Sequence, residues 1–113
     1  MIKHEFLLLK NAPKELPLSS IKNYPRDEMT VISDDFILEN HIPIRKVEMF
    51  WETLDNKNYG LNYYGVTLIN SNMAEELKQE LQQYCEASED LAKLIELLDQ
   101  AIENNMYIIH FGI

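Results

Sequence analysis

The chain has 113 residues, 46% of them hydrophobic, and a formal net charge of −9. This length suits one core, so we expect a single globular domain over residues 1–113. The apolar runs are much shorter than the ~20 residues that cross a bilayer. The shortage of Lys and Arg argues against nucleic acid or an anionic membrane as a partner.

Two further features predict a cytoplasmic location. The first residues, Met-Ile-Lys-His-Glu, lack the apolar segment and small-residue cleavage site of an export signal. The single cysteine, Cys85, cannot form an internal disulfide, which is typical of a reducing compartment.

The first third of the chain predicts strands separated by irregular segments. His4–Lys10 has the composition of a strand, and prolines break any regular element over 11–25. Met29–Ser33 predicts a short strand, and Asp34-Asp35 after it has turn chemistry. We expect Phe36–Leu38 to continue the pairing as a hairpin.

The middle of the chain predicts a helix and then a strand. Apolar residues at i, i+3, i+4 and i+7 favour a helix over Ile44–Asn56. These residues are Val47, Phe50, Trp51 and Leu54. After a turn at Asn58–Gly60, Leu61–Ile69 is rich in aromatic and β-branched residues and predicts a strand. Gly65 inside it suggests a bulge or a close approach by another backbone.

The last third predicts two helices and a final strand. Asn72 is the expected N-cap of the first helix, in capping-box register with Glu75. Ser88 is the expected N-cap of the second helix, and Asn104-Asn105 is a reasonable stop. Met106–Ile113 then predicts a buried strand, paired within the sheet.

Together these elements predict an α+β fold in the order β-β-(β)-α-β-α-α-β. We expect one mixed or antiparallel sheet of about four to five strands, with three helices packed on it.

The negative charge is concentrated in the last third of the chain. Residues 1–70 have a net charge of −2, and residues 71–113 have a net charge of −7. Glu96, Asp99 and Glu103 fall at i, i+3 and i+7 of the last helix, where like charges cost a few tenths of a kcal/mol per pair. The sequence shows no local compensation, which either a basic partner or water and salt would supply.

A second group of acids competes for the role of a partner-binding surface. It comprises a predicted turn and the outer side of the predicted middle helix: Asp34, Asp35, Glu48, Glu52 and Asp55. Loops often carry binding specificity, which makes this group a real alternative.

No catalytic or metal-binding motif is recognisable. His4, His41 and His110 are far apart, without HExxH or a Cys/His cluster, so we expect no metal site. With three glycines, the chain has no phosphate-binding loop, and we expect no cofactor. We interpret His110 as a hydrogen-bonded histidine within the sheet and Cys85, near a helix C-terminus, as structural.

Two segments resemble a group of small acidic bacterial proteins. They are FWETLDNKNYGLNYYGVTLI (Phe50–Ile69) and IENNMYIIHFGI (Ile102–Ile113). The resemblance is to immunity proteins of contact-dependent inhibition and polymorphic toxin systems. It implies a cytosolic protein that binds one cognate toxin domain, often a nuclease, and covers its active site or substrate path.

We therefore expect a non-enzymatic, protein-binding inhibitor whose acidic side chains bind a basic toxin domain. Two alternatives stay open. One is an adaptor or regulatory subunit of a protein complex, or a phage-encoded inhibitor. The other is a small enzyme that uses His110 with a carboxylate.

Overall fold

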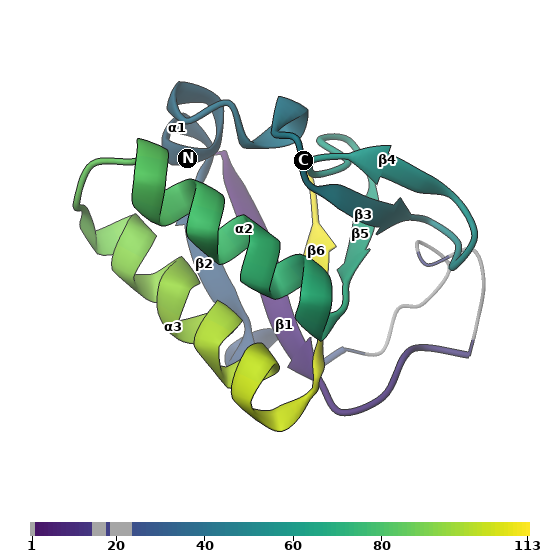
Figure 1. Cartoon of the computed structure of the whole chain (residues 1–113). Helices are drawn as coiled ribbons and strands as arrows, with labels where there is room; N and C mark the ends of the chain where they lie inside the picture. The colour runs from purple at the N-terminus through teal and green to yellow at the C-terminus, as the bar shows by residue number, and fades with distance from the viewer. Residues whose placement is uncertain (1, 15–17, 19–23) are drawn as a thin grey trace.

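The fold is built on one antiparallel sheet of six strands, in the order β2-β1-β6-β5-β3-β4 (Figure 1). A computed structural model describes residues 2–14, 18 and 24–113. The strands are β1 (Lys3–Leu9), β2 (Thr30–Ser33), β3 (Glu48–Trp51), β4 (Lys57–Tyr59), β5 (Val66–Ile69) and β6 (Tyr107–Phe111). The α-helices are α1 (Asp34–Glu39), α2 (Ser71–Tyr84) and α3 (Glu89–Asn104), and the short 3-10 helices are η2 (Arg26–Glu28) and η3 (Ile42–Ile44).

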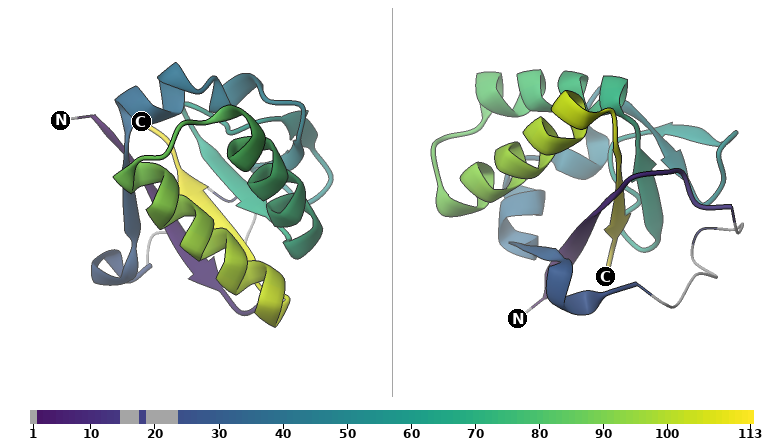
Figure 2. Two further views of the ribbon diagram at one scale, coloured as in Figure 1. Left: turned by 60° about the vertical axis from the view of Figure 1, so that its left-hand side comes forward. Right: turned by 90° about the horizontal axis from the view of Figure 1, so that it is seen from below.

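Helices α2 and α3 lie side by side on one face of the sheet (Figures 1 and 2). They bury their apolar stripes against it, including Leu77 and Leu81 of α2 and Leu94 and Leu98 of α3. A smaller core on the opposite face is made by Leu7, Leu18, Val66, Leu68 and Ile109. The sheet is therefore apolar on both faces.

The C-terminal strand β6 lies in the middle of the sheet. It pairs with β1 through Phe6↔His110 and with β5 through Thr67↔His110. The prediction of a buried, paired final strand is confirmed. This pairing brings the first and last strands of the chain together and places His110 between them.

Of the three predicted helix ends, the two of α3 are confirmed. Ser88 accepts the Leu91 N–H at the start of α3, and Asn105 adopts the left-handed conformation (φ 51°) after its end. Helix α2 ends at Tyr84. Its start differs, because Asn70 and not Asn72 is the N-cap, so the predicted capping box is wrong.

The predicted helix over Ile44–Asn56 is wrong, because this segment forms β3 and the turn toward β4. Val47 and Met49 are buried with exposed Glu48 between them, which is the alternation of a strand. Phe50 contacts the cores on both faces of the sheet. The apolar residues of this segment therefore pack on two faces, whereas an amphipathic helix would have one apolar face. Glu52 has a positive φ of 63°, which a continuing helix does not allow.

The predicted turn at Asp34-Asp35 and the pairing segment Phe36–Leu38 are also wrong, since both lie in α1. Ser33 is its N-cap and accepts the Phe36 N–H. An acidic first turn favours a helix start, and the same residues in sequence are equally good turn formers.

The predicted fold class is confirmed: an α+β fold with one antiparallel sheet and three α-helices in the part of the chain that the structure describes. The sheet has more strands than expected. None of the described helices is long and apolar enough to span a membrane.

Candidate functional site

The structure brings one of the two predicted acidic sets together on a single surface. Glu96, Asp99 and Glu103 lie along the outer side of α3, whose inner side packs on the sheet. Glu96 and Glu103 are exposed and Asp99 is half-buried. We call these three residues the acidic face of α3.

A groove of about 560 Å³ lies along α3, with Gln82 of α2 also in its lining, and all three residues of the acidic face of α3 line it. Its floor contains the half-buried side chains of Leu91 and Ile95. An apolar floor beneath carboxylates can accept an aliphatic or aromatic side chain while the acids bind cations nearby. We call it the α2–α3 groove.

Asp99 is not without local compensation, contrary to the expectation for this row. Its carboxylate forms an ion pair with Lys78 of the neighbouring helix α2. Both side chains remain partly exposed, at 29% and 38%, so water screens the pair. Among the three residues of the acidic face, Glu96 and Glu103 are the ones exposed to a partner.

A second groove, of about 430 Å³, lies on the other side of α3. It separates α3 from β2 and is lined by Glu96, Leu97 and Gln100 of the helix and by Thr30 and Val31 of the strand. We call it the β2–α3 groove. Glu96 lines both grooves, so α3 stands as an acidic ridge between them.

The second predicted set is dispersed, because the helix that would have aligned it does not form. Asp34 is buried and Asp35 is exposed on α1, whereas Glu48 is exposed on β3 and Asp55 lies in the turn after it. Asp55 accepts a hydrogen bond from the Thr53 hydroxyl.

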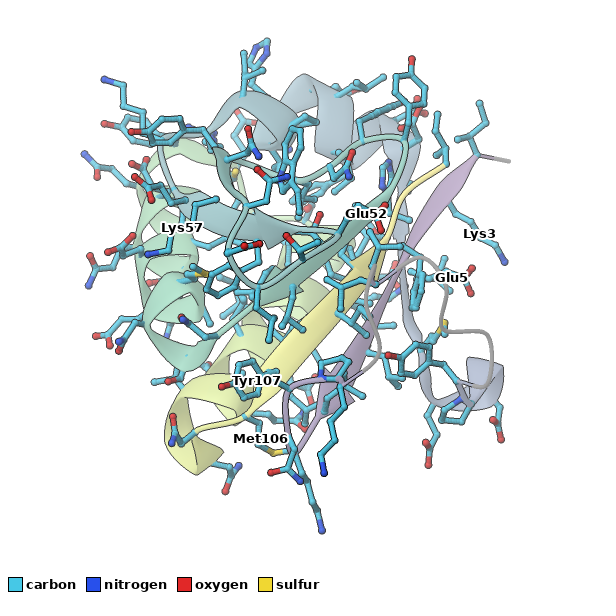
Figure 3. All side chains as sticks on the ribbon, turned by 90° about the vertical axis from the view of Figure 1, so that its right-hand side faces the viewer. Lys3, Glu5, Glu52, Lys57, Met106 and Tyr107 are labelled. Atoms are coloured by element: carbon cyan, nitrogen blue, oxygen red, sulfur yellow. The ribbon has the colours of Figure 1, made fainter. Side chains whose placement is uncertain are left out.

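Glu52, the remaining member of the second set, has a structural role. It is half-buried, and its carboxylate accepts the Val66 N–H at the start of β5. Figure 3 shows Glu52 on the side of β6 and Lys57 on the side of α2. Because Glu52 is bonded within the fold and the other members lie on α1, on β3 and in the turn after β3, the second set forms no continuous surface.

A polar cluster that was not predicted from the sequence lies beneath α1 at one end of the sheet. We define the buried polar cluster as His4, Asp34, Tyr63, Thr67 and His110. His4, Thr67 and His110 have no exposed surface, and Asp34 is buried. The cluster joins β1, β5, β6, α1 and the β4–β5 loop.

The contacts of the cluster form an unbroken chain. His4 Nδ1 lies 2.8 Å from His110 Nε2, and His4 Nε2 lies 3.0 Å from Asp34 Oδ1. His110 Nδ1 lies 3.1 Å from Thr67 Oγ1. The Tyr63 hydroxyl donates to Asp34 Oδ1 at 2.5 Å. Each buried polar group therefore has a partner, as buried groups require.

One assignment of donor and acceptor roles satisfies every contact in this chain. Thr67 accepts the Asn62 N–H at 2.8 Å and donates its own proton to His110 Nδ1. His110 Nε2–H then donates to His4 Nδ1, and His4 Nε2–H donates to Asp34. Each group in the series Thr67, His110, His4 thus donates to the next, and the series ends on the carboxylate of Asp34.

The environment shifts three ionisation equilibria in the cluster. Hydrogen bonds from Tyr63 and then His4 lower the pKa of Asp34 below its ordinary 3.8. The bond to Asp34 raises the pKa of Tyr63 to about 12. Burial, with a smaller effect of His4, holds the pKa of His110 well below its ordinary 6.5. The Asp34 carboxylate is therefore stabilised by the hydrogen bonds that it accepts in the cluster.

The cluster agrees with the interpretation of His110 as a hydrogen-bonded histidine within the sheet. A carboxylate lies near it, as the enzyme alternative required, but the His110 ring has no exposed surface on which a substrate could meet it. Within the described ranges no group of His, Cys, Asp or Glu is arranged to hold a metal ion.

Cys85 is the C-cap residue of α2 and is half-buried. Burial raises the pKa of its thiol, so the reactive thiolate is disfavoured. The guanidinium of Arg45 lies 3.9 Å from its sulfur and 5.2 Å from the centre of the Tyr84 ring. These contacts are consistent with a structural cysteine.

No protein-family model matches this chain, and neither the curated proteins nor the solved structures include a significant match.

Proposed function

We propose that this chain is a non-enzymatic, protein-binding inhibitor, an immunity-type protein that acts in the cytoplasm on one cognate toxin domain. The toxin domain is expected to be basic and nuclease-like, and the inhibitor would cover its active site or substrate path. The acidic face of α3, at the rim of a groove with an apolar floor, is the observation that carries this proposal.

The charge of the helical layer supports a basic partner. Residues 71–104, which include α2 and α3, contain nine acidic and two basic side chains. A surface with this imbalance attracts a basic protein over about one Debye length, ~10 Å at 0.1 M salt, and speeds the encounter. A nuclease domain fits this field, because its substrate cleft must be basic to bind phosphates.

The geometry of the face supports binding after the encounter. The α2–α3 groove offers Leu91 and Ile95 at its floor for an anchoring side chain, and Glu96 and Glu103 at its rim for Lys or Arg. Charge pairs that lose water in such a contact carry more specificity than exposed ones. Inhibition then follows from occupation of the toxin's cleft and needs no chemistry from this chain.

The test uses the C-terminal domain encoded by the gene directly upstream, because immunity genes follow their toxin genes. Co-expression should rescue cells from that domain, and the purified pair should associate more slowly as salt rises. The triple variant Glu96→Gln, Asp99→Asn, Glu103→Gln should associate about 10-fold more slowly at low salt. Failure of rescue, or an association rate independent of salt, would overturn the proposal.

A matched control removes the same charge elsewhere. Asp35→Asn, Glu48→Gln, Asp55→Asn neutralises three exposed acids of the dispersed set. It should keep an association rate within about 2-fold of wild type, since these acids do not share a surface. An equal slowing by both triples would assign the effect to total charge and not to α3. Stable assembly with a housekeeping complex, without rescue, would favour the adaptor alternative.

A further inference from the structure

The strand β2 forms one edge of the sheet, and no described strand lies beyond it. Figure 2 shows it as the outermost strand on its side, beneath α3. An edge strand presents unpaired backbone N–H and C=O groups, which can pair with another chain.

The pairing register identifies the outward groups. The Asp34 N–H donates to the Ile2 carbonyl at 3.1 Å, so these two residues form a hydrogen-bonded pair. Such pairs alternate along antiparallel strands, so His4↔Ile32, two residues further, is also hydrogen-bonded. Val31, between these positions, directs its N–H and C=O away from β1.

Ser33 is related to Val31 by the same alternation and directs its N–H outward. Its carbonyl is used differently, because Ser33 is the N-cap of α1 and its carbonyl lies where the helix begins. The free edge therefore offers three groups: both groups of Val31 and the N–H of Ser33. Three groups suffice for the pairing of a short strand.

The opposite edge of the sheet gives a comparison within the same molecule. There the short strand β4 carries Lys57 and exposed Tyr59. Lysine on an edge strand is a common protection against unwanted pairing. β2 has the sequence Thr-Val-Ile-Ser and carries no charge, so it lacks this protection.

The β2–α3 groove lies directly beside the free edge. A strand added to β2 would run about 4.8 Å from it, and alternate side chains would point toward α3. Those side chains would enter the groove between Val31 and Leu97, with Glu96 and Gln100 beyond them. The edge and the groove can therefore hold the backbone and the side chains of one segment.

The charges near the edge select the segment. Asp27 and Glu28 lie in η2 just before β2 and are exposed, and Glu96 is exposed in the groove. Lys93 is the one basic side chain among the groove residues. Asp90 is also close to the edge, since it accepts a hydrogen bond from the Ser33 hydroxyl at the end of β2. These four acids outnumber Lys93 and Arg26 of η2, so a basic segment is favoured over an acidic or neutral one.

We propose that β2 binds an extended, basic segment of the partner protein by strand addition, with the alternate side chains of that segment in the β2–α3 groove. This proposal names the docking mode for the function proposed above and rests on it. Backbone pairing supplies affinity, and Glu96 with the groove supplies selectivity for Lys or Arg.

The probe is an acetylated seven-residue peptide of alternating lysine and valine, titrated into the full chain and followed by NMR. At saturation, amide hydrogen exchange at Val31 and Ser33 should slow about 10-fold, while Lys57 and Tyr59 in β4 should not change. The control peptide is N-methylated at two adjacent central residues. It has the same charge but cannot pair along either edge, and should bind about 10-fold more weakly.

A variant tests the same contact from the other side. Val31→Pro removes an outward N–H without breaking the ladder to β1, a position where edge strands tolerate proline. It should lose about 10-fold in affinity for the unmethylated peptide, whereas Val31→Thr and Tyr59→Pro should bind as wild type does. If Val31→Pro does not fold, the N-methylated peptide still decides.

Two results would overturn the proposal. One is equal binding of both peptides with unchanged exchange at Val31, which would mean attraction by charge alone. The other is no saturable binding up to millimolar peptide, since edge and groove are already formed. Neither result touches the inhibitor function, which is measured separately by toxin rescue and by the salt dependence of association.

Discussion

The buried polar cluster and the acidic face of α3 both contain ionisable side chains, but they satisfy them in opposite ways. In the cluster, His4 and His110 have no exposed surface and each polar atom has a partner within the chain. On α3, Glu96 and Glu103 are exposed, and only the half-buried Asp99 is paired within the acidic face, with Lys78.

This difference separates a structural role from a binding role. A buried polar group without a partner costs about 1–3 kcal/mol, so the cluster must stay assembled for the fold to hold. An exposed carboxylate costs little when its position changes, so the acids of α3 are free to follow a partner. Variants of the cluster should change stability, and variants of α3 should change association.

The largest effect is expected at the centre of the cluster. His110→Ala leaves a cavity beside Phe6 and removes the partners of His4 and Thr67. We expect the free energy of unfolding to fall by ~3 kcal/mol, measured by urea denaturation.

Two further variants serve as comparisons for His110→Ala. Thr67→Val preserves the shape of the side chain but leaves the Asn62 N–H and His110 Nδ1 unpaired, and should cost about 1–2 kcal/mol. Glu103→Gln on exposed α3 should change stability by less than ~0.5 kcal/mol. An equal loss in Glu103→Gln would remove the distinction between the two regions.

A smaller loss is expected on acidification. The pKa of His110 is held well below 6.5 by burial, so the unfolded chain binds a proton more readily than the folded chain. Stability should therefore fall as the pH drops below 6.5, and fall again as the pH approaches the lowered pKa of Asp34. Urea unfolding at pH 7.5 and 5.5 measures the first step.

At alkaline pH, stability should fall as the pH rises, because Tyr63 loses its proton. The pKa of Tyr63 is raised from 10.0 to about 12, so its contribution is complete below pH 10 and is lost toward pH 12. His110→Gln should lack the step near pH 6 while keeping the alkaline loss. A wild-type step that persists in His110→Gln would place the acid sensitivity outside the cluster.

The last helix and the last strand could be predicted from sequence because their local patterns agree with their environment. Helix α3 has one apolar face toward the sheet, a clear N-cap at Ser88 and a left-handed residue at Asn105. Strand β6 has the composition of a buried strand. In each case, the nearest neighbours along the chain contain the information that determines the structure.

The prediction for the β3 segment was wrong because its apolar pattern fits both a helix and a strand, and the pattern alone does not say which is more stable. Spacing of Val47, Phe50 and Trp51 fits a helix, whereas Val47 and Met49 around Glu48 fit a strand. The choice depends on the sheet, since β3 pairs with β4 and β5 and is apolar toward both cores. Such pairing lies outside any short window.

One part of the candidate site could be predicted from the sequence and the other part could not. The acidic row of α3 could be predicted because one helix aligns Glu96, Asp99 and Glu103. The buried polar cluster could not, because His4 and His110 are joined only when the first and last strands pair. Its one available indication was a histidine among apolar residues in each of those strands.

A small effect, and the sharpest test of the contrast, concerns the Lys78–Asp99 pair. Because both side chains are partly exposed, Lys78→Met should cost less than ~1 kcal/mol in urea denaturation. A double-mutant cycle with Asp99→Asn isolates the coupling of the pair. The same substitution frees Asp99 and makes the helical layer more acidic, so association with a basic partner should become faster at low salt. A coupling as large as the loss in His110→Ala would show that the acidic face of α3 is held together as the cluster is. A weak coupling with faster association would mean that α3 keeps its acids for another protein.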